Sequence, residues 1–516
     1  MTAKIPHFFP FPQHVFPPNS IKISIFAANF NLANLHLLKM KKQTLLLPLF
    51  VLGINCSAQI SQKISKGFHN PIIDHTFTAD PTAVEHEGRI YVYGTNDHEQ
   101  YLNAEKNGYE KIKTLAMMST DDMVNWTYHG LIPVGKLAPW IINSWAPSVV
   151  SRMEEDGKTH FYLYFSNSGF GTGVLTSTSP VGPWTSPLEK SIVDAKTNGL
   201  GDCNVPFDPG VMIDDDGVGW LAFGAGRSRI ARLGKDMLSF DSPFINPRPQ
   251  HHFEANEMNM IGGKYVYTYN LDWEDHSDWK LSDEQPPRCC MGYMVSPNPL
   301  DSLSWTYGNN YMNNPGECEG TGWQYANNHT HLHKFQGQWY LFYHNMHLQD
   351  SRGIQGGFRS MCIDKIDIDE QNARISFCKA SNEGVEQIKP LNPYIRQEAE
   401  TAAATEGIRF EQGDAPGNMI AIAGSPFTKN DISTETLILV RGVDFQKKAK
   451  ALSARLKGKG TLTLHLDNPD ASSVATLTSL DDEWKDLKAK TSITGIHDIY
   501  FRLTSNLNFD YWQFVK

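Results

Sequence analysis

The segment Gly88-Arg-Ile-Tyr-Val-Tyr93 decides the fold, because similar segments recur along the chain. In each copy a glycine-led turn precedes a strand rich in aromatic residues, which is the pattern of a β-hairpin. Five such hairpins with almost no helical periodicity predict an all-β chain with a five-bladed β-propeller over residues 68–385. A long β-sandwich is the competing interpretation. The other copies are Gly157-Lys-Thr-His-Phe-Tyr-Leu-Tyr164, Gly217-Val-Gly-Trp-Leu-Ala-Phe223, Gly263-Lys-Tyr-Val-Tyr-Thr-Tyr269 and Gly337-Gln-Trp-Tyr-Leu-Phe-Tyr343.

A second domain is predicted after the propeller. Residues 386–395 contain two prolines and are expected to form a linker. Residues 396–516 contain short alternating strands, such as Thr461-Leu-Thr-Leu-His-Leu466, separated by turn signals. That spacing is typical of a β-sandwich or jelly roll, and about 120 residues suffice for one such core.

The beginning of the chain has the features of a leader. A basic start at Met40-Lys41-Lys42 is followed by an apolar run over 44–53 and by small residues at Cys56-Ser57-Ala58. This order predicts a signal peptide over Met40–Ala58 and a secreted or periplasmic location. It also predicts that translation begins at Met40, so that residues 1–39 lie upstream of the true start. Anchoring as a lipoprotein through Cys56 is the less favoured alternative.

The charge balance and the hydrophobic pattern exclude two kinds of partner. The chain carries 46 basic and 56 acidic residues, a net charge of −10, whereas a nucleic-acid binder needs a basic face. The apolar run of the leader is too short to span a bilayer, and no longer run follows it. The sequence leaves the oligomeric state and the pairing of the cysteines open.

Three carboxylates stand directly before three of the hairpins. Asp80 lies in Thr-Ala-Asp-Pro, Asp208 in Pro-Phe-Asp-Pro-Gly, and Glu254 in His-His-Phe-Glu-Ala. The first strand of each propeller blade lines the central channel, so these groups are expected to converge there. Crowded carboxylates raise one another's pKa, and glycoside hydrolysis needs one protonated acid and one ionised base. Taken singly, the two Asp-Pro pairs are also common turn residues, and Glu257 is the alternative to Glu254.

His329, His331 and His333 alternate along the chain, so they are expected to share one face of a strand. A three-histidine metal site is one interpretation of this pattern. A single buried histidine with polar neighbours is the favoured one.

Together these motifs resemble glycoside hydrolase family 43 over residues 68–385. The resemblance implies a five-bladed propeller and an inverting mechanism with Asp80 as general base, Glu254 as general acid, and Asp208 tuning and orienting the acid. An inverting site holds its acid and base about 6.5–9.5 Å apart, and we expect that separation for Asp80 and Glu254. The matching segments are Asn70-Pro-Ile, Ala79-Asp80-Pro81, Trp145-Ala-Pro147, Asp208-Pro-Gly210, Phe253-Glu254-Ala255 and Asn327-Asn-His329.

The same resemblance implies further contacts in the site. Trp145, His329 and Arg359 are expected to bind substrate, and His329 to lie near the propeller axis, where it can hold a calcium ion through water. The chemistry itself needs no cofactor. One departure from the family pattern is Ser148, which follows Trp-Ala-Pro at a position that is often acidic.

Residues 396–516 resemble carbohydrate-binding module family 6. The resemblance implies a structural calcium ion held by Glu398, Glu400 and Asp510, whose hard oxygen atoms suit that ion. An aromatic residue expected near 415–425 for sugar binding is missing, so a role as a structural brace is the alternative. The matching segments are Gln397-Glu398-Ala-Glu400, Arg441-Gly-Val-Asp-Phe445, Gly495-Ile-His-Asp-Ile-Tyr500 and Asn508-Phe-Asp510-Tyr-Trp-Gln-Phe514.

The two resemblances imply an exo-acting hydrolase that releases α-L-arabinofuranose from plant cell-wall polysaccharide, such as arabinoxylan, or from xylo-oligosaccharides. A β-xylosidase of the same family is the alternative, because both sugars present similar hydroxyl groups. A non-catalytic glycan-binding propeller is the rival from another class. The presence of all three expected carboxylates favours an enzyme.

Overall fold

The structure is a computed structural model that describes residues 61–314, 327–427 and 436–516, apart from 447 and 505. The predicted signal peptide Met40–Ala58, its Cys56 and the upstream residues 1–39 lie outside the described residues. Among the helices that are described, none is long and apolar enough to cross a membrane.

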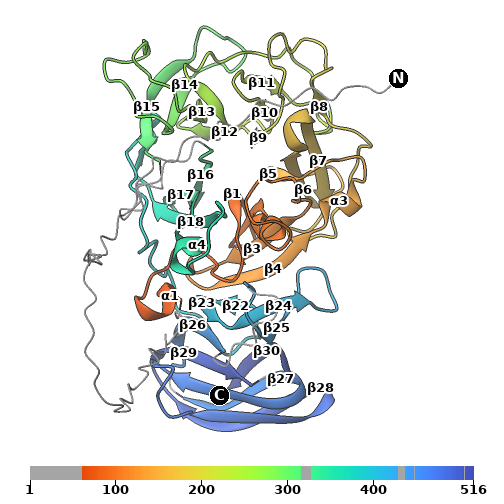
Figure 1. The fold of residues 1–516 in the computed structure, drawn as a ribbon, viewed down its shortest axis with the longest axis vertical. Coiled ribbons are helices and arrows are strands. Elements are labelled where there is room, and N and C mark those ends of the chain that lie inside the picture. Colours follow the sequence, from red (N-terminus) through yellow and green to blue (C-terminus); the bar gives the residue numbers. More distant parts are fainter. Residues whose placement is uncertain (1–60, 315–326, 428–435, 447, 505) are drawn as a thin grey trace, which may run out of the picture. The chain divides into compact units, whose positions relative to one another are not determined.

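Five small antiparallel sheets follow one another along the chain and confirm the propeller (Figure 1). Blade 1 contains β1 (Ala79–His86), β2 (Arg89–Thr95), β3 (Leu115–Thr120) and β4 (Trp126–Ile132), and blade 2 contains β5 (Trp145–Met153), β6 (Thr159–Ser166), β7 (Gly171–Ser177) and β8 (Val193–Asp194). Blade 3 contains β9 (Gly210–Ile213), β10 (Gly219–Phe223) and β11 (Arg229–Arg232). Blade 4 contains β12 (His252–Ile261), β13 (Lys264–Leu271), β14 (Met291–Ser296) and β15 (Thr306–Met312), and blade 5 contains β16 (Thr330–Phe335), β17 (Gln338–Asn345) and β18 (Ser360–Lys365).

Short elements connect or flank the blades. They are α1 (Gln62–Ser65), α2 (Asp97–Tyr101), α3 (Val134–Leu137), the 3-10 turn η1 (Ser168–Phe170), α4 (His347–Ser351), and the strand pair β19 (Ile368–Asp369) and β20 (Arg374–Ile375). The five glycines of the sequence repeat stand at the turns between the first and second strands of the blades, with φ between 72° and 86°. A left-handed backbone of this kind favours glycine, so the repeat in sequence is a repeat of turn geometry.

The first strands of the blades form the inner ring of the propeller. They contact one another in the order β1, β5, β9, β12 and β16, and β16 contacts β1 again. Side chains on these strands accept backbone N–H groups from the next blade. Thr82 accepts one from β5 at 3.1 Å, Ser148 one from β9 at 2.9 Å, and Glu257 one from β16 at 3.1 Å. Ser148 therefore links two blades.

The segment before β1 closes the ring by running along blade 5. The Asn70 side chain donates to the carbonyl groups of Ile363 (3.0 Å) and Ser381 (2.9 Å), and accepts the N–H of Ile363 at 2.8 Å. Backbone bonds of 2.9 Å from Ile72 and Thr78 continue this pairing along β18 and the residue before it. The Asn-Pro-Ile motif is thus part of the ring closure.

The second domain is a nearly closed, sandwich-like sheet, as predicted. Its strand order is β23-β26-β29-β27-β30-β25-β24, with β21 and β28 attached at β30 and β27. Its core is apolar and includes Phe501, Phe509, Trp512 and Phe514. The strands are β21 (Gln397–Glu398), β23 (Ala404–Glu406), β24 (Ile408–Gln412), β25 (Met419–Ala423), β26 (Leu437–Asp444), β27 (Ala449–Leu466), β28 (Ala475–Ile493), β29 (Ile496–Leu503) and β30 (Leu507–Val515).

The two domains are hydrogen-bonded into one compact unit. Strand β22 (Thr401–Ala402) pairs with β4, so blade 1 gains a fifth strand from the second domain. Asp74 accepts the N–H and the hydroxyl of Thr405, each at 3.0 Å, and Arg352 donates to both oxygens of Glu406 at 3.0 Å. These bonds join the edge of the propeller to the start of the sandwich.

Candidate active site

The predicted site residues stand at kinks in the inner strands. Asp80 and Asp208 have φ values of 51° and 52°, and the residues directly after Trp145 and Glu254 have φ values of 39° and 63°. In β1, β5 and β12 the pairing register shifts at these positions, which is the mark of a β-bulge. Bulges re-aim side chains, and strained backbone of this kind clusters at functional sites. Four blades thus have a left-handed residue near the start of the inner strand, and three of them also have a bulge there.

His329 brings two of the carboxylates together. Its Nδ1 lies 3.4 Å from Asp80 Oδ1, and its Nε2 lies 3.2 Å from Asp208 Oδ2. Burial disfavours the charged ring, but the two carboxylates outweigh burial and raise the pKa of His329 to about 10. The ring is therefore a cation at neutral pH, without a lone pair to offer. The predicted calcium contact through water stays a prediction.

Asp80 is buried and held in its ionised form. Thr95 Oγ1 donates to Asp80 Oδ2 at 2.6 Å, and Arg359 Nη1 donates to Asp80 Oδ1 at 2.8 Å. Burial alone would raise the pKa of Asp80, but Arg359, followed by His329, holds it well below its usual range. An ionised carboxylate is what a general base requires.

Arg359 is fixed from behind by Asp97. Its Nε and Nη2 each donate to an oxygen of Asp97 at 2.8 Å, while Nη1 reaches Asp80. Both side chains are buried, and the ring of Tyr109 covers the guanidinium group at 5.0 Å. Arg359 therefore reaches the centre through Asp80, and its predicted contact with substrate stays a prediction.

The surroundings of Glu254 shift its pKa in the opposite direction from that of Asp80. It lies on β12 and is half-buried. Burial raises the pKa of Glu254 well above its usual range, the charges of Asp208 and Asp80 raise it further, and His329 opposes them. These surroundings favour the protonated form of Glu254, which is what a general acid requires.

Asp208 connects the two sides of the centre. Its Oδ1 accepts the hydroxyl of Ser166 at 3.1 Å, and its Oδ2 accepts the N–H of Ala255 at 3.1 Å. Because Ala255 directly follows Glu254, Asp208 is bonded to the strand that carries the protonated carboxyl group. Asp80, Asp208, Glu254, His329 and Arg359 are called the active centre below.

Glu257 and the other two histidines belong to a different group. Glu257 is buried, and its Oε1 lies 2.8 Å from His331 Nδ1. His331 Nε2 in turn lies 3.3 Å from His333 Nδ1, whose ring has its pKa lowered to about 3 by burial. The structure therefore separates His329 from His331 and His333, and it separates Glu257 from Glu254.

Trp145 lies at the start of β5, beside the active centre. Its Nε1 donates to the carbonyl of Tyr109 at 3.0 Å, and the two rings meet edge to face at 6.0 Å. The side chain is partly exposed. Its role in substrate binding stays a prediction.

Four residues that support the centre were not predicted from the sequence. Three are Thr95, Asp97 and Tyr109, and the fourth is His344, whose Nδ1 accepts the N–H of Asp80 at 3.1 Å. Burial lowers the pKa of His344 to about 3, so its ring is neutral. Thr95 and His344 lie at the ends of second strands, which antiparallel pairing brings level with the beginnings of the first strands. Polar residues at the ends of the repeated hairpins were the signal to look for.

In the second domain, the three predicted calcium ligands lie near one another. Burial raises the pKa of Glu400 well above its usual range, and the charges of Glu398 and Asp510 add to this. Glu400 Oε1 accepts the N–H of Met419 at 2.9 Å, while Oε2 is buried without a hydrogen-bond partner. That oxygen suits a cation, although Arg396 already donates to both oxygens of Glu398 at 2.7 Å.

Comparison with known proteins agrees with this geometry. Residues 68–373 match the family described as glycosyl hydrolases family 43. The chain is 33% identical over 534 residues to the arabinoxylan arabinofuranohydrolase of Bacillus subtilis (strain 168), covering 92% of this chain and 99% of that protein. It is 32% identical over 512 residues to the arabinoxylan arabinofuranohydrolase of Paenibacillus polymyxa, covering 91% and 78%. A crystal structure of the family 43 arabinoxylan arabinofuranohydrolase from Bacillus subtilis, in complex with cellotetraose, superposes with a TM-score of 0.79 at 32% identity, covering 87% of this chain and 98% of that one.

Proposed function

Because the chain belongs to glycosyl hydrolases family 43 and is a glycosidase, we propose that it is an inverting, exo-acting α-L-arabinofuranosidase acting on arabinoxylan-type polysaccharide. The observation that carries the proposal is that two carboxyl groups in one centre have surroundings that shift their pKa values in opposite directions. The pKa of Asp80 is held low and that of Glu254 is held high. The names of the most similar relatives support the choice of sugar.

In the proposed reaction, Asp80 takes a proton from a water molecule as its oxygen attacks the anomeric carbon. Glu254 gives its proton to the departing glycosidic oxygen in the same step. One displacement on the face opposite the leaving group inverts the anomeric configuration, and it requires the two carboxyl groups about 6.5–9.5 Å apart. Arg359 and His329 favour the ionised form of Asp80 before the attack, and burial together with Asp208 favours the protonated form of Glu254.

The sugar is tested with two aryl glycosides side by side, one of α-L-arabinofuranose and one of β-D-xylose. We expect release from the arabinofuranoside, release of arabinose from arabinoxylan, and an inverted anomer in the first seconds by proton NMR. Faster release from the xyloside would replace the proposal with a β-xylosidase. Binding of arabinoxylan without release of any sugar would favour a glycan-binding propeller.

The roles of the two carboxyl groups are tested with leaving groups of different acidity. Glu254→Gln is expected to lose about 10²–10⁴-fold in kcat/KM on arabinoxylan. The loss should be far smaller on a dinitrophenyl arabinofuranoside, whose leaving group needs no proton. Asp80→Asn should lose activity on both substrates alike, because every substrate needs the attacking water. Equal losses for both variants on both substrates would contradict this assignment.

We also propose that the second domain binds a calcium ion through Glu398, Glu400 and Asp510. The buried, unpartnered Glu400 Oε2 supports this assignment. Calcium should raise the Tm of the chain, and Glu400→Gln should abolish that increase. An equal increase in the variant would place the ion elsewhere.

The location outside the cytoplasm that Met40–Ala58 predicts would suit an enzyme that acts on a polysaccharide. It is tested by sequencing the N-terminus of the protein recovered from the producing cells. Cleavage after Ala58 would support export, whereas a protein that still begins at or before Met40 would contradict it.

A further inference from the structure

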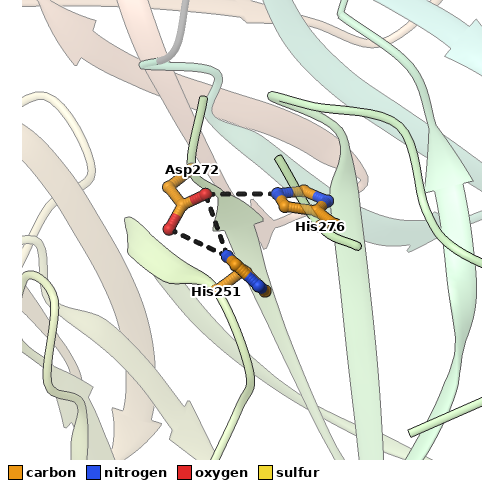
Figure 2. A group of neighbouring side chains, drawn as sticks. All are labelled: His251, Asp272 and His276. Atoms are coloured by element: carbon orange, nitrogen blue, oxygen red, sulfur yellow. Dashed lines mark hydrogen bonds and ion pairs between the residues drawn. The ribbon is translucent and has the colours of Figure 1, made fainter. Parts of the chain in front are cut away.

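A second group of histidine and aspartate side chains lies outside the active centre (Figure 2). His251 directly precedes β12, Asp272 directly follows β13, and His276 lies in the segment that leads to β14. His251 Nδ1 lies 3.2 Å from both oxygens of Asp272, and His276 Nε2 lies 3.1 Å from Asp272 Oδ1. These three residues are called the outer cluster. Their side chains bond to one another, to Asp278 and to the carbonyl of Pro286, and to none of the active-centre residues.

In each ring, the nitrogen that points away from Asp272, called the outer nitrogen, already donates a hydrogen bond to another group. His276 Nδ1 lies 3.0 Å from the carbonyl oxygen of Pro286, and His251 Nε2 lies 2.6 Å from Asp278 Oδ1. A carbonyl or carboxylate oxygen only accepts, so these two nitrogens carry hydrogen atoms. The inner nitrogens, His251 Nδ1 and His276 Nε2, face one carboxylate at hydrogen-bond distance, and a metal ion would displace any proton that they hold there.

This is the arrangement that metal-binding histidines adopt. Such a histidine nearly always donates its other N–H to a carboxylate or a backbone carbonyl, which fixes the tautomer and aims the lone pair. The three ligand atoms lie within 4.8 Å of one another. Zinc–ligand distances of about 2.0–2.1 Å in a tetrahedron place neighbouring ligands about 3.3 Å apart. The two nitrogen–oxygen separations, 3.2 Å from His251 and 3.1 Å from His276, are close to that value.

We propose that His251 Nδ1, His276 Nε2 and an oxygen of Asp272 bind a zinc ion. Two imidazole nitrogens with one carboxylate suit zinc, whereas calcium prefers oxygen ligands throughout. His276 is fully buried, and the side chains of His251 and Asp272 are 13% and 21% exposed, so the ligands are held in place while water can complete the tetrahedron.

The ion would fasten the segment between β13 and β14 to the inner strand of blade 4. Asp272 already bonds to His251 through its backbone N–H at 2.9 Å, and its carbonyl accepts the N–H of Cys289 at 2.9 Å. His251 precedes Glu254 by three residues. The zinc ion would therefore stabilise the end of the strand that carries the proposed acid, without taking part in the reaction.

The test is a zinc titration of the full chain, free of any affinity tag and freed of metal with a chelator. We expect one zinc ion per chain by calorimetry and by metal analysis after dialysis, together with a higher Tm. Cobalt(II) added in place of zinc should give the visible absorption of a tetrahedral site, which requires no variant to fold. Failure of the unaltered chain to retain a stoichiometric ion would overturn the proposal.

Two variants locate the ion. Asp272→Asn and His276→Gln should each weaken zinc binding at least about 100-fold, since each removes a ligand. His160→Gln is the matched control, because His160 Nε2 lies 3.0 Å from Asp156 Oδ2 but His160 is not part of the outer cluster. The control should bind zinc like the unaltered chain. Equal binding by His276→Gln and His160→Gln would also overturn the proposal.

Discussion

The active centre and the outer cluster use the same two kinds of side chain in opposite proportions. In the active centre one ring, His329, lies between two carboxylates, with Glu254 as a third acidic group nearby. In the outer cluster one nitrogen from each of two rings faces a single carboxylate, Asp272, while the other nitrogens face Asp278 and the carbonyl of Pro286. Several carboxylates around one ring favour the protonated form of a carboxyl group, which can then give its proton to a leaving group. Two rings aimed at one carboxylate, each fixed by an acceptor at its other nitrogen, offer a metal ion two nitrogen ligands.

Apart from direct substitution of Asp80 or Glu254, the largest expected effect comes from removing the carboxylate charge of Asp208. Asp208→Asn should lower kcat/KM at neutral pH on the order of 10²-fold, because Glu254 then loses its proton more easily. Asp208 is one of the causes of the raised pKa of Glu254. A general acid works only below its pKa, so the alkaline limb of the pH profile should move to lower pH.

The pH profile of an aryl arabinofuranoside measures this shift. Ser166→Ala is the control, because it removes a hydrogen bond to Asp208 at 3.1 Å but leaves the charge. An alkaline limb that stays in place in Asp208→Asn would contradict the proposed role of Asp208.

A smaller loss of kcat/KM is expected when the Arg359 guanidinium and the Asp97 carboxylate that holds it are removed together. The double variant Arg359→Gln/Asp97→Asn avoids leaving either charge buried alone. Burial should then raise the pKa of Asp80, so that the base becomes protonated and activity is lost as the pH falls. We expect kcat/KM to fall about 10-fold for each pH unit below the raised pKa of Asp80, so the acid limb of the pH profile should move to higher pH. A uniform loss with an unmoved acid limb would contradict this role of Arg359.

The third prediction separates the two glutamates of β12. Glu257 accepts the N–H of Leu332 and pairs with His331, both across to blade 5. Glu257→Gln should therefore lower the free energy of unfolding by about 1–3 kcal/mol and leave kcat unchanged. Denaturant unfolding and kinetics on the same sample measure both quantities. A loss of activity as large as that of Glu254→Gln would instead make Glu257 the acid.

The smallest effect is expected on the free energy of unfolding, when His276 of the outer cluster is replaced and no metal ion is present. Burial opposes the charge on His276, but its hydrogen bond with Asp272 prevails and raises its pKa. Its contribution to stability is thus present in full below its unfolded pKa of about 6.5, and is lost as the pH rises through the raised value. In the presence of a chelator, His276→Gln should cost about 1 kcal/mol at pH 5.5 and less at higher pH. A cost that grows with pH would mean that the ring is neutral there.

The sequence predicted the positions of the three carboxylates because the hairpins repeat. Once Gly88, Gly217 and Gly263 are recognised as turns, the residues before them lie on inner strands, and inner strands meet at the axis. The same argument did not extend to Asp97 or His344. Their importance comes from contacts with Arg359 and Asp80 across blades, and no local pattern encodes those contacts.

The outer cluster could not be predicted because bulges change the register. Near the turn of blade 4, Ile261 pairs with Lys264, and at the far end His252 pairs with Leu271. Over this stretch β12 has 10 residues and β13 has 8. Counting pairs outward from the turn would therefore misplace Asp272 by two residues, and its position beside His251 appears only in the folded sheet.

The closure of the ring by Asn70 also determines when the propeller can be completed on the ribosome. Asn70 is made early, but its partner Ile363 follows 293 residues later. At synthesis rates of about 5–20 residues per second, the closing segment waits roughly 15–60 s for blade 5. During that time Phe77 lacks its partners Leu348 and Phe358, and Ile72 and Ile73 lack the blade 5 side chains that complete their core. The first part of the propeller to be synthesised is therefore among the last to fold, and a chaperone that binds apolar segments would find it exposed.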